Sequence, residues 1–132
     1  MEEPWLSLSL LIGRTFLALV YLVSGIHKGI WYEKALAEFQ QATIPFVGAA
    51  VVVTVTLHTV ASICLILGVF VQEVAIALAI FTLLASYKAH NFWNRAGSDR
   101  LDQSRIAMAH LAIVGGLLLL AAVGPGRYVI GG

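Results

Sequence analysis

Apolar residues gather in four long stretches separated by shorter polar segments. The stretches cover about residues 4–26, 46–70, 74–93 and 106–123. A helix needs roughly 20 apolar residues to cross the hydrocarbon core of a bilayer. The third and fourth stretches reach that length only with end residues whose polar tips extend to the interface. The pattern predicts an all-α, polytopic membrane protein whose four transmembrane helices form an antiparallel bundle.

The polar segment at residues 33–42 adds one further element. Its sequence, EKALAEFQQA, consists of residues that favour helices, and Leu36 and Phe39 lie on one side of such a helix. An amphipathic helix of this kind can lie in the membrane interface. Pro45 then ends the segment before the second span. We therefore expect a short interfacial helix between spans one and two.

Composition narrows the class of protein further. Of the 132 residues, 60% are hydrophobic and 11% are charged, and the mean hydropathy is +0.91. Such a chain cannot supply the polar exterior of a soluble domain, whereas lipid covers the sides of a membrane bundle. A net charge of +1 without a basic tract argues against nucleic-acid binding. Cys64 is the only cysteine, which argues against a dithiol site. We expect one domain over residues 1–132.

Basic residues are divided unequally between the two sides of the predicted bundle. Six flank or lie in the loops after the first and third spans, namely Lys28, Lys34, Lys88, Arg95, Arg100 and Arg105. The opposite side carries Arg127 alone. Loops rich in Lys and Arg stay in the cytoplasm, so we expect both termini outside. Because the amino terminus lacks a basic segment and Arg14 interrupts its apolar run, we expect a permanent first span rather than a cleaved signal.

Arg14 and His58 are polar residues well inside apolar stretches. By helical rise, each lies about 15–18 Å from the start of its span, near the middle of a core about 30 Å thick. Two interpretations of Arg14 remain open. In one, Arg14 extends outward and pairs with Glu73. In the other, it faces the bundle interior and, together with a neutral His58, holds an anionic or carbonyl-bearing ligand.

Three other histidines lie near the predicted inner ends of the spans. His27, His90 and His110, with Lys28, fall near one level of the bundle. Imidazoles at one level suggest a ligand site, and metal or haem held between His90 and His110 are two options. The alternative is that these histidines bind backbone or lipid head groups. We favour this alternative and predict no metal site, because no HxxxH or HxxE spacing is present.

Several motifs in order resemble the DoxX family. They are Arg14 in the first span followed by Ser24-Gly25-Ile26-His27-Lys28, the leucine-rich end of span two at Gly68, His90-Asn91-Phe92-Trp93, and Gly115-Gly116 followed by leucines and Gly124-Pro125-Gly126. The resemblance implies a four-helix protein of the bacterial inner (plasma) membrane. It best carries over to Arg14, Lys28 and His90. Family members often have glutamate where His58 stands and a residue such as asparagine where His110 stands.

The resemblance also implies candidate functions. Some relatives resemble the membrane subunit of thiosulfate:quinone oxidoreductase, so an accessory or quinone-linked subunit of an oxidoreductase complex is our first hypothesis. A quinone would then bind Arg14 and His58, and a partner subunit would supply the electrons. The alternatives are a non-catalytic scaffold, which would assemble a complex or a homo-oligomer through small residues such as Gly116, and a small transporter or proton path.

Overall fold

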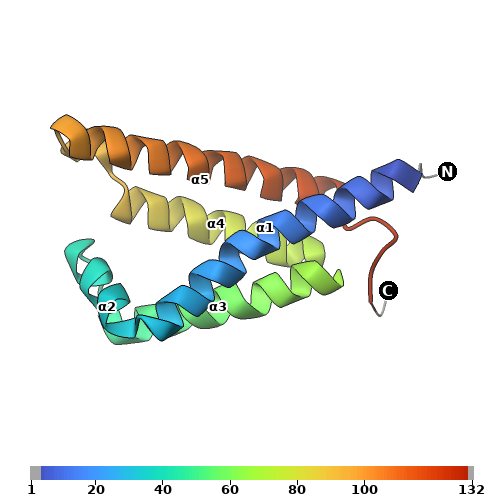
Figure 1. Ribbon diagram of the computed structural model, residues 1–132, viewed down its shortest axis with the longest axis horizontal. Helices are drawn as coiled ribbons and strands as arrows, with labels where there is room; N and C mark the ends of the chain where they lie inside the picture. The colour runs from blue at the N-terminus through green and yellow to red at the C-terminus, as the bar shows by residue number, and fades with distance from the viewer. Residues whose placement is uncertain (1–3, 131–132) are drawn as a thin grey trace.

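The computed structural model describes residues 4–130 of the chain (Figure 1). In chain order its elements are α1 (Pro4–Ile30), α2 (Tyr32–Gln41), α3 (Val47–Leu67), α4 (Val71–Ala89), the 3-10 turn η1 (Phe92–Asn94) and α5 (Gly97–Val123). Four segments are long and apolar enough to cross a membrane: α1, α3, α4 continued through η1, and α5. The structure confirms the predicted four-helix membrane bundle.

The helix boundaries differ from the expected spans mainly outside the apolar stretches. The fourth span was expected to begin near Ile106, but α5 begins at Gly97 and includes Asp99 and Arg105. Likewise α1 continues beyond Ile26 to Ile30. A helix that leaves the hydrocarbon keeps its backbone hydrogen bonds, so polarity marks where the membrane ends and not where the helix ends.

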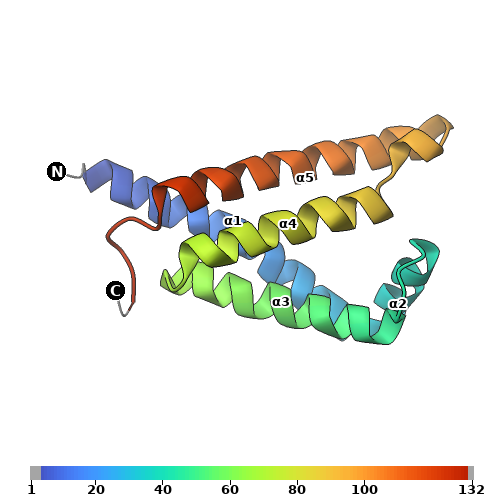
Figure 2. The ribbon, with the colours of Figure 1, turned by 180° about the vertical axis from the view of Figure 1, so that it is seen from behind.

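The short helix between the first two spans is also confirmed. Helix α2 turns sharply away from the end of α1 and lies beside the start of α3, at the end of the bundle that we call the α2 end (Figure 2). Its Ala35 is buried, whereas Glu33 and Lys34 are exposed. The chain then reverses through Thr43 and Phe46, both with positive φ, and enters α3. Helix α2 therefore partly covers one end of the bundle.

The spanning helices form two pairs. Helix α1 packs mainly against α3, and α4 packs mainly against α5. The pairs meet at the opposite end of the bundle, which we call the tail end because residues 124–130 lie there, and they separate toward the α2 end (Figures 1 and 2). The buried core between the pairs includes Ala18, Leu65, Ala75, Leu78 and Leu117. Small residues in that core allow close approach of helices that hydrophobic burial alone does not hold together in lipid.

Candidate functional site: a cavity between two helix pairs

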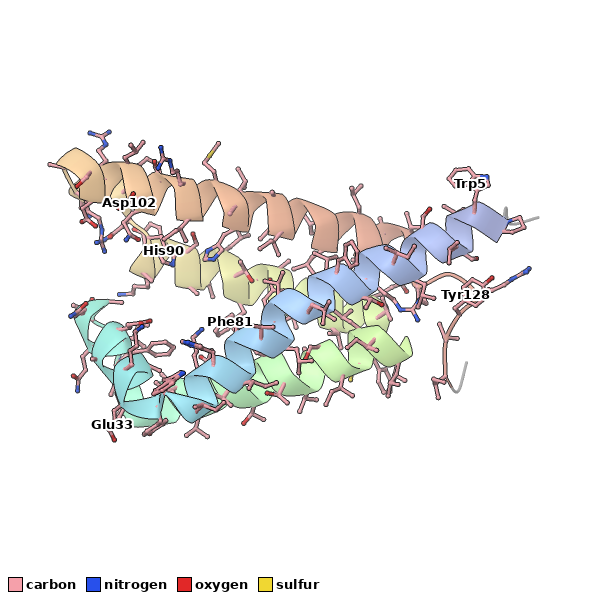
Figure 3. The ribbon with its side chains drawn as sticks, viewed as in Figure 1. Trp5, Glu33, Phe81, His90, Asp102 and Tyr128 are labelled. Atoms are coloured by element: carbon pink, nitrogen blue, oxygen red, sulfur yellow. The ribbon has the colours of Figure 1, made fainter. Side chains whose placement is uncertain are left out.

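A cavity of about 790 Å³ lies where the two helix pairs separate. Side chains from α1, α2, α3, α4 and α5 line it, and most of its wall is apolar. Lys28, His58, His90 and His110, four of the residues singled out from the sequence, are on its wall. Two lining residues are labelled in Figure 3. Phe81, within α4, marks the deeper part of the cavity, and His90, the residue directly after α4, marks its mouth.

His58 lies in the deeper part of this cavity. Its side chain is 6% exposed, and both ring nitrogens are buried without a hydrogen-bond partner in the described part of the chain. Instead the ring makes edge-to-face contacts with Tyr21 and Phe81, each with ring centroids 5.1 Å apart. A buried polar atom without a partner is costly, so each such atom calls for an explanation.

The closeness of α1 and α3 beside His58 depends on Gly25. A Cβ atom at this position would lie 2.9 Å from Oγ1 of Thr59 and 3.2 Å from Cβ of His58. Any other side chain would therefore push the helices apart next to His58. In the wall of the cavity, the Tyr21 hydroxyl and Oγ1 of Thr82 are 2.5 Å apart and link α1 to α4. These contacts define the walls around the imidazole.

The mouth of the cavity, toward the α2 end, is richer in polar groups. Lys28 donates from Nζ to Oγ of Ser24 at 2.6 Å, and Nδ1 of His90 is 2.6 Å from Oε1 of Gln103. The rings of His90 and His110 meet edge to face with centroids 5.0 Å apart. Nδ1 of His110 is buried and has no hydrogen-bond partner among the described residues. Lys28, His90 and His110 therefore line the same cavity.

His27 is the histidine that does not join this group. It is exposed, lies outside the cavity lining, and its ring centroid is 6.4 Å from that of Trp31. Within residues 4–130, no group of three or more His, Cys, Asp or Glu side chains is arranged to hold a metal ion.

Arg14 lies outside the lining of the cavity, although it is 1% exposed. Its Nε donates to the carbonyl oxygen of Leu65 at 2.8 Å, and its Nη1 donates to that of Pro125 at 2.8 Å. Its Nη2 donates to the carbonyl oxygens of Ile66, at 3.3 Å, and of Tyr128. The guanidinium therefore joins the end of α3 to the tail formed by residues 124–130.

This arrangement completes the carboxyl end of α3. The last four carbonyls of a helix have no partner within it. Here the Cys64 oxygen accepts from the amides of Gly68 and Val69 at 2.8 and 2.9 Å, and the Leu67 oxygen accepts from the amide of Ile130 at 2.8 Å. Arg14 donates to the two carbonyls that lie between them, those of Leu65 and Ile66. A cation also interacts favourably with the negative end of a helix dipole.

Gly68 allows the tail to approach α3 this closely. It ends α3 with φ +82°, a left-handed conformation that favours glycine. A Cβ atom there would lie 2.6 Å from Cγ1 of Val129 and 3.0 Å from its Cα. The tail contacts this glycine directly, and any larger residue would push it away.

Neither expected partner of Arg14 is found in the described part of the chain. No ion pair joins Arg14 to Glu73, which is exposed in the first turn of α4. No hydrogen bond joins Arg14 to His58. The partners are backbone carbonyls, which carry no residue-specific signal in a sequence.

Four membrane-crossing helices that enclose a largely apolar cavity with buried polar groups make this chain an integral membrane protein. The family model described as DoxX matches residues 9–91, more than half of the chain, so the protein belongs to the DoxX family. It is similar to the inner membrane protein YphA of Escherichia coli (strain K12), with 27% identity over 118 residues that cover 89% of this chain and 84% of the relative. No solved structure matches it.

Proposed function

We propose that the protein is a membrane subunit that binds a quinone in the cavity between its helix pairs, with His58 hydrogen-bonded to a quinone carbonyl. The observation that supports this proposal best is the pair of buried His58 nitrogens that lack partners. A neutral imidazole has one N–H donor and one acceptor, and a carbonyl oxygen would satisfy the donor. The aromatic rings of Tyr21 and Phe81 on either side would stack against a flat ligand.

The size and character of the cavity support a ligand of this class. Small-molecule sites usually have volumes of about 300–1,000 Å³ and a largely apolar wall with a few polar groups that set orientation. The cavity, at about 790 Å³, lies in that range. The ring would occupy the region of His58, and an isoprenoid tail would lie along the apolar wall.

Arg14 takes no part in this proposal. The sequence suggested that Arg14 and His58 would share the quinone, but Arg14 already donates to four backbone carbonyls. A guanidinium that left them to reach a ligand would expose buried carbonyls. We therefore assign the ligand to His58 and the integrity of the bundle to Arg14.

Electrons would reach the quinone from a partner subunit. Cys64 is the only cysteine, so this chain cannot hold a four-cysteine iron–sulfur cluster or a dithiol pair by itself. A partner with a redox cofactor would dock on the membrane surface or on a helix face. This assigns the chain an accessory role within an oxidoreductase complex.

The relative YphA is named as an inner membrane protein, and we place this chain in the same kind of membrane. The excess of Lys and Arg in the loops at the α2 end favours an arrangement with that end in the cytoplasm and both termini outside. The cavity mouth would then face the cytoplasm.

A binding titration tests the proposal. A short-chain quinone is titrated into purified protein in detergent micelles, and quenching of tryptophan fluorescence reports binding. Replacing His58 with Phe keeps a flat ring but removes both nitrogens, and we expect affinity to fall by about tenfold or more, the effect of losing one buried hydrogen bond. His27→Phe is the matched control, since His27 is exposed outside the cavity. Equal quinone affinity in wild type and His58→Phe would refute the proposal.

A further inference from the structure

The mouth of the cavity carries more positive than negative charge. Lys28, Lys88 and Arg95 line it, and Glu38 is the acidic residue among the lining residues. Arg95 is already paired with Asp99 at 3.1 Å. Within residues 4–130 this is the one ion pair closer than 4.0 Å, so neither lysine at the mouth contacts a carboxylate. Neither lysine forms an ion pair, although Glu38 is close enough to Lys28 to act on it electrostatically.

Lys28 is the most unusual of these groups. It is half-buried near the end of α1, and the hydrogen bond that its Nζ makes is to the hydroxyl of Ser24. An ammonium has three donors and no acceptor, so one neutral hydroxyl leaves most of its capacity unused. A charge held in low-dielectric surroundings is costly unless an opposite charge is close. Glu38 offsets part of this cost without touching Lys28, and an anion in direct contact with the ammonium would offset more of it.

His110 offers a second polar contact on the opposite wall. Its Nδ1 is buried without a hydrogen-bond partner among the described residues, and its ring is held edge to face against His90. Both residues line the same cavity as Lys28. An oxyanion between α1 and α5 would accept from the ammonium and from the imidazole together.

We propose that the cavity mouth binds a phosphate or carboxylate group, with Lys28 as the main donor and His110 as the second. The group belongs either to a free anion or to the head group of an anionic lipid whose chain enters the cavity. This site is distinct from the quinone position. Tyr21, which touches His58, and Lys28 are seven residues apart on α1, about 10 Å along the helix. The anion proposal does not require quinone binding.

Glu38 opposes anion binding and so provides a second test. It is exposed on α2 but lines the mouth that Lys28 lines. A carboxylate there repels an incoming anion. Removing its charge should therefore strengthen anion binding, whereas removing the charge of Lys28 should weaken it.

The experiment has two arms that distinguish the sources of the anion. In the first, native mass spectrometry measures lipid retained by the full chain from an equal mixture of phosphatidylglycerol and phosphatidylcholine. In the second, the melting temperature in detergent is measured in sodium phosphate and in sodium chloride of equal ionic strength. Both arms compare wild type with Lys28→Met, and with Lys34→Met, which removes an exposed lysine outside the cavity lining.

In Lys28→Met we expect the affinity for the anion to fall by about tenfold or more. This fall would appear as a lost preference for phosphatidylglycerol, as a lost stabilisation by phosphate, or as both. Lys34→Met should match wild type, and Lys28→Arg, which keeps the charge, should bind within about threefold of wild type. A loss in the lipid arm assigns a head group, and a loss in the phosphate arm assigns a free anion. If Lys28→Met matches wild type in both arms, the proposal is wrong.

If Lys28→Met does not fold, Glu38→Gln decides the question. An increase in affinity for either probe of about threefold or more would support the proposal, since removing a nearby like charge removes its repulsion of the anion. Unchanged affinity for both probes would overturn it.

Discussion

Replacing Arg14 with Leu should destabilise the bundle and release the tail, and it should leave the cavity lining unchanged because Arg14 is not part of that lining. Arg14 donates to the carbonyls of Leu65, Ile66, Pro125 and Tyr128. A hydrogen bond within a membrane protein contributes about 0.6 kcal/mol on average and up to about 1.7. Four such bonds give a loss of roughly 2–7 kcal/mol in the free energy of unfolding if their contributions add.

The unfolding free energy is measured in mixed micelles as denaturing detergent is added. Release of the tail is followed by the rate of chymotrypsin cleavage after Tyr128, which should rise in Arg14→Leu. Arg14→Lys should fall between the two, because a single ammonium cannot reach four carbonyls as a planar guanidinium does. Arg127→Leu removes an exposed arginine from the same tail and should match wild type. Wild-type stability and wild-type cleavage in Arg14→Leu would refute the role assigned to this residue.

Two further substitutions test the walls of the cavity, and one measurement tests its orientation. Gly25→Ala should lower the unfolding free energy by about 1–3 kcal/mol, because the added methyl group overpacks α1 against α3. Gly13→Ala, whose added Cβ meets no atom within 4 Å, should be neutral or stabilising. Equal effects of the two substitutions would contradict the close approach of α1 and α3 at Gly25. Tyr21→Phe should cost about 1 kcal/mol, because it removes the hydrogen bond to Thr82, and an unchanged unfolding curve would argue against that link between the pairs. A reporter enzyme that works only outside the cytoplasm should be active when fused to the carboxyl terminus, and a reporter that works only in the cytoplasm should be inactive there. The opposite result would contradict the predicted topology.

The helices could be predicted from sequence because lipid imposes a simple rule on length and hydropathy. The pairing of α1 with α3 and of α4 with α5 could not be predicted in the same way. In a soluble protein, the polar face of a helix marks its exposed side, so the opposite, apolar face is the buried one. In these spans, exposed residues outside the cavity such as Val52 and Leu83 are as apolar as buried Leu65 and Leu78. The sequence therefore shows that the helices cross the membrane but not which faces meet.

The candidate site was predicted in part, for a related reason. Lys28, His90 and His110 line one cavity, and the sequence could place each near the polar end of its span, because position along a span can be estimated from helical rise. The sequence placed Arg14 inside an apolar stretch but left open whether it extends outward or faces the bundle interior. Its partners could not be predicted, because backbone carbonyls at the end of α3 and in the tail are identical in every sequence. The proximity of Tyr21 and Phe81 to His58 needed the three-dimensional arrangement.

The proposed quinone site at His58 is tested most directly by measuring what the protein retains from its own membrane. The chain is purified in mild detergent as wild type, His58→Phe and His27→Phe, and organic extracts are analysed for quinone by mass spectrometry. We expect quinone to approach one molecule per chain in wild type and in His27→Phe, and to fall about tenfold or more in His58→Phe. Wild-type protein that carries no quinone above the level in the detergent, or equal quinone in His58→Phe, would contradict the claim.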